Sequence, residues 1–322
     1  MMALSKLSGD EQGILFTQLC NALEPGVAVA LSSVSNELRT ATLALQQQLR
    51  ADHEAAARMC RKVGLWSCKE LREAKKVEWC HLSLTAAELT LLGKLGSMLP
   101  ALEKLSLMEY HDRWHVTSAP LNGVQGLAAG LGAGALPAVT YLSIFGMHMG
   151  DAGASALAAA LGQGALPRVR YLFLGMASIG DAGLVVLAPA LRRLPALEYL
   201  CLQDNPFGDE GLDALVAPPP PAGAPPTATG VLTKLNVLIL RSTKVTDAGC
   251  TALAAVLNSG ALPALEYLDL NFTPLSYDAK AVVYDARANL TGLDDSDQES
   301  GESGSESEYA PHVQVSAPEE VW

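Results

Sequence analysis

Leucine and other aliphatic residues recur through the middle of the chain in the pattern L-x-x-L-x-L, which is clearest at Leu197–Leu202. Neighbouring copies of this pattern begin 28 to 38 residues apart. Alternation of apolar residues over so few positions predicts a short strand that turns one face toward a core. Six such strands are predicted, and their first positions are Leu102, Val139, Val169, Leu197, Leu235 and Leu265.

A helix is predicted after each regular strand. Four of these helices start at a motif in which an aspartate is followed two residues later by glycine, and the aspartates are Asp151, Asp181, Asp209 and Asp247. Aspartate is a favoured N-cap because its carboxylate accepts hydrogen bonds from backbone amides that lack an intrahelical partner. We therefore expect each aspartate to cap the helix that it begins. A run rich in alanine and leucine follows, and proline then closes the unit.

A weaker copy of the pattern precedes the six regular ones. Counting back 28 residues from Leu102 brings Val77 and Trp79 into register, with a helix predicted over Thr85–Met98 behind them. We interpret this segment as a degenerate first repeat that caps the stack. The array then covers residues 74–288 with about seven repeats, which is above the ~3 that a stable solenoid needs.

A strand and a full helix within each unit of about 28 to 30 residues resemble the leucine-rich repeat of the ribonuclease-inhibitor-like subclass. The resemblance implies an α/β fold, a leucine-rich-repeat solenoid with a curved parallel sheet on the concave side and helices on the convex side. The usual asparagine after the strand occurs here only as Asn205, so we expect the family's asparagine ladder to be missing. The equivalent positions hold Tyr110, Met147, Ala177, Thr243 and Thr273.

Residues 1–73 lack the repeat and are predicted to form an N-terminal helical segment. The predicted helices are Asp10–Leu23, Val27–Val34 and Ser35–Arg61. The order of apolar and polar residues between Leu7 and Arg39 is similar to an F-box, and this resemblance implies a Skp1-like adaptor as a partner. The alternative is a helical cap that covers the apolar end of the solenoid.

Two insertions enlarge the array, at Val116–Gly123 and at Ala217–Gly230. The second contains four consecutive prolines, Pro218–Pro221, which favour the polyproline II conformation. This segment is either a passive loop or a docking site for an SH3 or WW domain.

Composition narrows the range of partners. Hydrophobic residues make up 49% of the chain, which supplies a sizeable core, and the net charge is -12. Nine acids and no Lys or Arg lie between Ala288 and Trp322, so residues 289–322 are predicted to form an acidic disordered tail. The rest of the chain is nearly neutral. Nucleic acid and anionic membranes require a basic footprint, so neither is expected as a partner.

The expected location is the cytoplasm, with the nucleus as the alternative. Asp10 and Glu11 stand where a signal peptide would need its apolar run, and no segment reaches transmembrane length. The six cysteines are scattered without a C-x-x-C pair, which is typical of reduced thiols.

No residue pattern indicates catalysis. His111 and His115 have the spacing of a metal-ligand pair on a helix, but they follow a strand directly, so a solvent-facing turn is favoured over a zinc site. The glycines of Gly130–Gly134 lack the G-K-[ST] ending of a P-loop and stand at the end of a helix. We therefore expect no enzyme activity, no cofactor and no metal.

Alternation within the strands predicts where a partner binds. If the leucines face the core, the residues between them point to the concave face, and four of the eight tyrosines then share one ladder. Exposed aromatic side chains are typical anchors of protein interfaces. The alternative is that the tyrosines only pack on one another along the sheet. The predicted protein-binding residues are Tyr141, Ser143, Phe145, Tyr171, Phe173, Tyr199, Cys201, Gln203, Arg241, Tyr267 and Asp269.

The predicted function is therefore a non-enzymatic protein–protein interaction module that binds a macromolecular partner on its concave sheet. An F-box-like substrate receptor of a ubiquitin ligase is one alternative. A GTPase-activating protein of the Ran type is another, because those proteins combine this repeat with an acidic tail. Their catalytic arginine has no identified position in this sequence.

Overall fold

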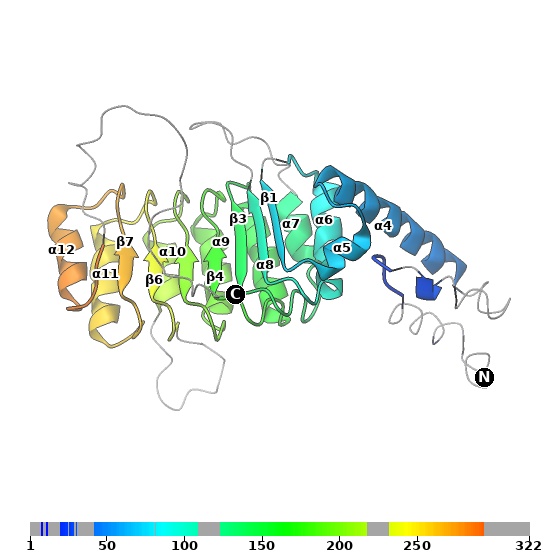
Figure 1. Ribbon diagram of the computed structural model, residues 1–322. Coiled ribbons are helices and arrows are strands. Elements are labelled where there is room, and N and C mark those ends of the chain that lie inside the picture. The colour runs from blue at the N-terminus through cyan, green and yellow to red at the C-terminus, as the bar shows by residue number, and fades with distance from the viewer. Residues whose placement is uncertain are drawn as a thin grey trace, which may run out of the picture. The chain divides into compact units, whose positions relative to one another are not determined.

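In the computed structural model of the chain, each predicted repeat contributes one strand to a single sheet (Figure 1). The structure describes residues 8, 11, 20–24, 26–28, 30, 42–80, 82–108, 123–217 and 232–292. Within these residues, seven parallel strands pair strictly in chain order. They are β1 (Lys76–Cys80), β2 (Lys104–Met108), β3 (Tyr141–Phe145), β4 (Tyr171–Phe173), β5 (Tyr199–Cys201), β6 (Val237–Ile239) and β7 (Tyr267–Asp269).

One helix follows every strand, and these helices cover the same side of the sheet (Figure 1). They are α6 (Ala86–Leu95), α7 (Gly123–Gly130), α8 (Gly150–Gly162), α9 (Asp181–Leu191), α10 (Asp209–Val216), α11 (Asp247–Asn258) and α12 (Tyr277–Asp285), and the short 3₁₀ helix η2 (Gly96–Met98) extends α6. Parallel neighbours need a crossover, and a repeated one-helix crossover leaves one face of the sheet without helices. This arrangement confirms the predicted α/β solenoid. We call the face away from α6–α12 the open face.

The core lies between the sheet and these helices. The central leucine of each regular strand is at most 2% exposed, and these residues are Leu105, Leu142, Leu172, Leu200, Leu238 and Leu268. Val77 and Trp79 of β1 are buried in the same core, as the weaker first repeat predicts. At the other end, Thr291 pairs with Tyr267 at the edge of β7. The leucine periodicity therefore encodes one continuous apolar layer.

The aspartates at the helix starts do not cap their own helices, which corrects the sequence-based expectation. The N-caps of α9, α10 and α11 are the preceding residues, Gly180, Gly208 and Thr246. Each carboxylate reaches sideways and accepts a hydrogen bond from a backbone amide at the start of the next helix. These bonds run from Gly180 to Asp151 (2.8 Å), Gly208 to Asp181 (2.8 Å), Thr246 to Asp209 (2.7 Å) and Ser276 to Asp247 (2.8 Å). The motif thus joins successive units.

The side-chain amide of Asn205 joins two successive turns of the array. Its Oδ1 accepts hydrogen bonds from the amides of Ala177 (3.2 Å) and Ile179 (2.9 Å). Its Nδ2 donates to the carbonyl oxygens of Leu174 and Leu202, both at 2.8 Å. In the next turn, the threonine at the same position uses its hydroxyl only as a donor to a carbonyl of its own turn. Asparagine therefore joins two units where threonine does not.

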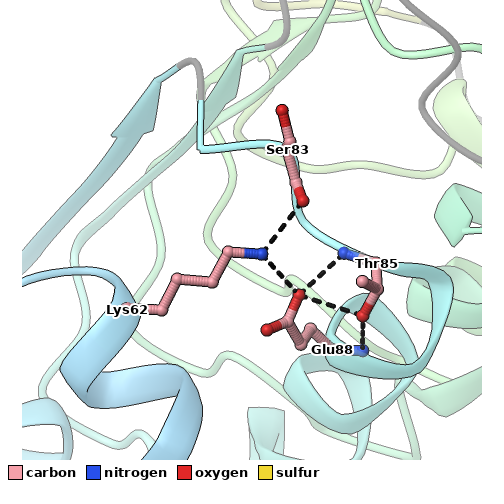
Figure 2. A network of polar contacts seen from close by, with 4 residues as sticks. All are labelled: Lys62, Ser83, Thr85 and Glu88. Carbon is pink, nitrogen blue, oxygen red and sulfur yellow. Dashed lines mark hydrogen bonds and ion pairs between the residues drawn. The ribbon is translucent and has the colours of Figure 1, made fainter.

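Two N-terminal helices, α4 (Leu43–Lys62) and α5 (Cys68–Glu73), pack on the first unit and share its core. Lys62 at the end of α4 donates to the Ser83 carbonyl oxygen and to Glu88 Oε2, each at 2.9 Å (Figure 2). Glu88 also accepts from the Thr85 amide at 2.7 Å, which completes a capping box at the start of α6. The network joins α4 to the solenoid.

Several sequence-based expectations fall wholly or largely outside the described residues. They are the first two N-terminal helices, the F-box-like order between Leu7 and Arg39, the pair His111 and His115, the insertions at 116–123 and 217–230, and the acidic tail after Gly292.

Candidate functional site

The register of the strands places the predicted binding residues in ladders on the open face. The first ladder runs Lys104, Tyr141, Tyr171, Tyr199, Val237 and Tyr267. The second runs Ser106, Ser143, Phe173, Cys201, Ile239 and Asp269. Phe145 ends β3, while Gln203 and Arg241 follow β5 and β6 by two residues. The register therefore places the predicted residues that lie within the strands on one side of the sheet.

Four aromatic rings of these ladders contact one another. The centroids of Tyr141 and Phe173 lie 5.0 Å apart, and those of Phe173 and Tyr199 lie 4.8 Å apart. Tyr171 lies 6.3 Å from Tyr141 and 6.4 Å from Tyr199. These distances are in the range of favourable ring pairs. Packing of the tyrosines along the sheet, the alternative weighed from the sequence, is therefore present.

Not all of the predicted binding residues are accessible. Tyr199, Cys201, Ser143 and Asp269 are only 5%, 3%, 2% and 4% exposed. Neighbouring strands lie about 4.8 Å apart, so large side chains on adjacent strands cover one another. Tyr199 and Cys201 form a small apolar cluster with Val237 and Ile239, separate from the main core. Sequence alternation places these side chains on the open face, but it does not reveal that neighbouring side chains bury them from solvent.

The accessible part is an aromatic platform, which we define as Tyr141, Phe145, Tyr171 and Phe173, all half-buried on β3 and β4. Phe145 lies over Gly175, where a Cβ atom would stand 2.5 Å from the Phe145 ring. Glycine at this position therefore makes room for the platform. Gln203, Arg241 and Tyr267 are half-buried beyond it.

Burial controls the ionisation of this surface. Loss of water, with a smaller effect of the Glu78 charge, raises the pKa of Tyr141 to about 12. Burial likewise raises the pKa of Tyr199, and it raises the pKa of the Cys201 thiol to about 12. At neutral pH the two phenols stay protonated and the thiol stays an unreactive neutral group. These three side chains therefore present neutral hydroxyl and thiol groups at neutral pH.

Two basic side chains lie beside the platform, and each forms an ion pair with a glutamate. Lys104 lies 2.5 Å from Glu78 and 4.7 Å from the centre of the Tyr141 ring. Arg170 binds both carboxylate oxygens of Glu198, at 2.9 and 2.6 Å, and lies 5.5 Å from the Tyr171 ring. A cation over an aromatic face is attracted by the ring quadrupole. Sequence reasoning missed the Glu78–Lys104 pair, although both residues occupy alternate positions of predicted strands.

A further pair was also missed. Ser178 Oγ and His148 Nδ1 lie 2.9 Å apart in the turns after β4 and β3. The two residues are 30 positions apart, so spacing offers no local signal. Among the residues that the structure describes, no group of three or more His, Cys, Asp or Glu side chains could hold a metal ion.

None of the helices in the described ranges has the length and apolar character needed to cross a membrane.

A sequence-family model for the leucine-rich repeat matches residues 194–216 and 231–254, which include β5, α10 and β6. The comparison with curated proteins found no match. The family match and the seven-stranded sheet together support a leucine-rich-repeat protein.

Three solved structures are among those that match this chain. An internalin from Listeria monocytogenes is 15% identical, with a TM-score of 0.33, and the match covers 63% of this chain and 49% of the internalin. A Bacteroides fragilis protein is 13% identical, with a TM-score of 0.42 and coverage of 74% and 69%. A leucine-rich-repeat protein from Leptospira interrogans is 14% identical, with a TM-score of 0.30 and coverage of 64% and 56%. This chain thus spans about half the length of the internalin.

Proposed function

We propose that the chain is a non-enzymatic protein–protein interaction module that binds a partner protein on the open face, the concave side of the sheet. The observation that carries the proposal is the aromatic platform on β3 and β4, whose residues alternate along the strands with the core residues Leu142 and Leu172. Leucine-rich-repeat proteins are generally interaction modules, and solenoids of this kind bind partners on their extended concave surfaces.

The energetics support binding at this place. Aromatic side chains on rigid strands lose little conformational entropy when a partner covers them, and each buries a large area. The ring contacts among Tyr141, Phe173 and Tyr199 hold the platform in place before a partner arrives. Such rigid aromatic anchors are the residues that most often dominate the binding energy of an interface.

The predicted binding residues divide into two roles. Contact with the partner is assigned to Tyr141, Phe145, Tyr171, Phe173, Gln203, Arg241 and Tyr267, which are half-buried. Support from beneath is assigned to Ser143, Tyr199, Cys201 and Asp269, which are buried.

The proposal is tested by affinity capture with the purified full chain. The variant is Tyr171→Ala/Phe173→Ala, which truncates the platform. The control is Val186→Ala/Tyr277→Ala, which removes two exposed side chains, 49% and 82% exposed, on α9 and α12. We expect at least one protein to be captured by wild type and control but not by the platform variant. Capture of the same proteins by all three would contradict the proposal. Unchanged circular dichroism verifies that each variant is folded.

The cytoplasm is the proposed location, with the nucleus as the alternative. All six cysteines are free, and five of them are buried, which supports a reducing compartment. A fluorescent fusion of the full chain tests this assignment by microscopy.

The F-box-like alternative rests on residues that lie mostly outside the described ranges, and it stays a prediction. Binding of purified Skp1 to the full chain tests it. The Ran-type alternative also stays a prediction, and stimulation of GTP hydrolysis by Ran tests it.

A further inference from the structure

The two edges of the sheet differ in how they are covered. At the β7 edge the chain itself returns. The amide of Leu268 donates to the carbonyl oxygen of Thr291 at 2.9 Å, and the amide of Thr291 donates to that of Glu266 at 2.8 Å. At the other edge, β1 pairs with β2 on one side. Within the part of the chain that the structure describes, no backbone group pairs with its other side, so β1 is an unpaired edge strand.

The backbone groups on the outer side of β1 belong to three exposed residues. The amide of Lys104 in β2 donates to the carbonyl oxygen of Lys75 at 3.0 Å, so Lys75 turns this group toward β2. Backbone groups alternate in direction along a strand, and those of Lys76, Glu78 and Cys80 therefore point away from β2. The edge presents amide donors and carbonyl acceptors at the spacing of a strand, which is the pattern that another strand pairs with.

The strand β1 lacks most of the features that keep an edge from pairing. Such strands are often short, interrupted by proline or a bulge, or charged on the side that faces the core. β1 has five residues that pair with β2 without interruption, whereas β4 to β7 have three each. Its core-facing residues, Val77 and Trp79, are apolar and buried. Its charged residues, Lys76 and Glu78, lie on the opposite face. The edge is therefore suited to pairing.

The helix layer favours a single strand over a second copy of the chain. α4 and α5 share the core of the first unit and extend the helix layer past α6, at the β1 end of the array (Figure 1). Neighbouring strands lie about 4.8 Å apart, but a helix with its side chains is about 10 Å wide. If two copies joined through β1 with their helices on one side, four extra helices would have to fit between the two α6 helices. A single strand brings no helix.

We infer that the outer edge of β1 is a second interaction surface, which binds an extended segment of a partner protein as an additional strand of the sheet. Hydrogen bonds between main chains supply the affinity in this mode of recognition. Glu78 is engaged by Lys104, whereas Lys76 has no ion pair among the described residues. The segment therefore carries an acidic residue beside Lys76, within an alternation of polar and apolar residues. This inference concerns a surface other than the aromatic platform and does not rest on the proposed function.

The test is fluorescence anisotropy of the peptide fluorescein-GSTVEVTVGS-amide, titrated with the purified full chain. The peptide alternates valine with polar residues around one acid. A comparison peptide is N-methylated at the glutamate and at the next valine, which removes an amide donor from each edge of the strand and keeps every side chain. We expect saturable binding of the first peptide with a Kd on the order of 10–100 μM. Binding of the second should be at least about tenfold weaker, because main-chain hydrogen bonds are lost.

Substitutions in β1 separate backbone from side-chain effects. Glu78→Pro removes an outward amide, which an edge strand tolerates on its free side, and should weaken peptide binding more than about tenfold. Glu78→Ala loses the same ion pair but keeps the amide, so its Kd should change less than about threefold. Lys76→Ala should weaken binding about twofold to fivefold through loss of one exposed charge pair. The platform variant Tyr171→Ala/Phe173→Ala should bind the peptide as wild type does.

Hydrogen exchange of wild type locates the peptide without any substitution. We expect the peptide to slow exchange of the outward amides of β1 and to leave those of β7 unchanged. The inference is overturned if the peptide does not bind up to about 1 mM, if N-methylation has no effect, or if the slowed amides lie outside β1. It is also overturned if Glu78→Pro keeps the circular dichroism of wild type and still binds equally well.

Sedimentation of wild type and Glu78→Pro tests for a second copy at the same edge. We expect both proteins to be monomeric. A wild-type dimer that Glu78→Pro dissociates would assign the edge to self-association and overturn the assignment to a partner protein.

Discussion

Oδ1 of Asp181 accepts hydrogen bonds from the backbone amides of Gly208 and Gly211, both at 2.8 Å. Both glycines belong to the next unit of the array. The same oxygen explains why residue 211 is glycine, because a Cβ atom there would lie 3.0 Å from it. The aspartate of one unit and the glycine of the next are therefore a matched pair. Repetition of the pair along the array makes each helix start depend on the unit before it.

Removal of this carboxylate should destabilise the solenoid. Asp181→Ala leaves two partly buried amides without acceptors, so we expect the free energy of unfolding in urea to fall by about 1–3 kcal/mol. Asp181→Asn keeps one carbonyl acceptor and should lose less. Asp213→Ala, at an exposed position of α10, is the matched control and should change stability by at most about 0.5 kcal/mol. Equal losses for Asp181→Ala and Asp213→Ala would show that the contact between units contributes nothing.

Glycine-to-alanine substitution should have opposite effects at two helical positions. At Gly249 a Cβ atom would lie 2.3 Å from Oδ1 of Asp209, so Gly249→Ala should destabilise the protein by about 1–3 kcal/mol. At Gly162, the last residue of α8, a Cβ atom would meet nothing within 4 Å. Gly162→Ala should therefore stabilise by up to about 1 kcal/mol, as helix propensity predicts. Thermal unfolding of the two variants measures both changes in stability. Stabilisation by both substitutions would contradict the close contact between Gly249 and Asp209.

Asn205 should be the most sensitive polar position of the turns. The side chain is 1% exposed, and its hydrogen bonds reach both its own and the preceding unit. Asn205→Ala should lower the free energy of unfolding by about 3 kcal/mol, because buried backbone groups lose their partners. Thr243→Val removes one hydroxyl bond at the equivalent position of the next turn and should lose about 1 kcal/mol. Urea titrations measure both, and a smaller loss at Asn205 than at Thr243 would contradict the assigned role.

The network at Glu88 predicts an acid-sensitive contribution to stability. Burial acts to raise the pKa of Glu88, but the hydrogen bonds from Thr85 and the ion pair with Lys62 outweigh it and hold the pKa below its ordinary 4.5. A pKa lower in the folded state means that the stabilisation is complete above the unfolded-state value and is lost as pH falls through the folded-state value. We therefore expect Glu88→Gln to lower stability by about 1 kcal/mol at pH 7.

The difference between wild type and Glu88→Gln should shrink and vanish as pH falls through the folded-state pKa of Glu88, which lies below 4.5, because Glu88 is then protonated. Urea unfolding across the pH range measures it. Glu210→Gln, at an exposed position in the first turn of α10, controls for the loss of one acidic charge. A difference that stays constant down to low pH would assign the effect of Glu88 to packing instead of charge.

Much of the fold follows from local sequence. The register of strands β2 to β7 is that of the leucine pattern, and the degenerate copy at Val77 and Trp79 does form β1. The predicted helix over Thr85–Met98 corresponds to α6 and η2. These features were predictable because strand alternation and helix boundaries depend on neighbours only a few residues away.

The sequence by itself determined that leucines form a shared core and that tyrosines occupy one ladder on the other side of the sheet. Only the tertiary structure decided which of those rings are buried and which are accessible to solvent. Tyr199 is buried, whereas Tyr171 is half-buried. The tertiary structure also decided that the carboxylate of Asp181, in α9, accepts a hydrogen bond from the N-cap residue of the next helix, α10. The physical reason is the same in both cases. Accessibility and hydrogen-bond partners are set by the distance between units stacked side by side, and a spacing of about 30 residues in sequence does not specify that distance.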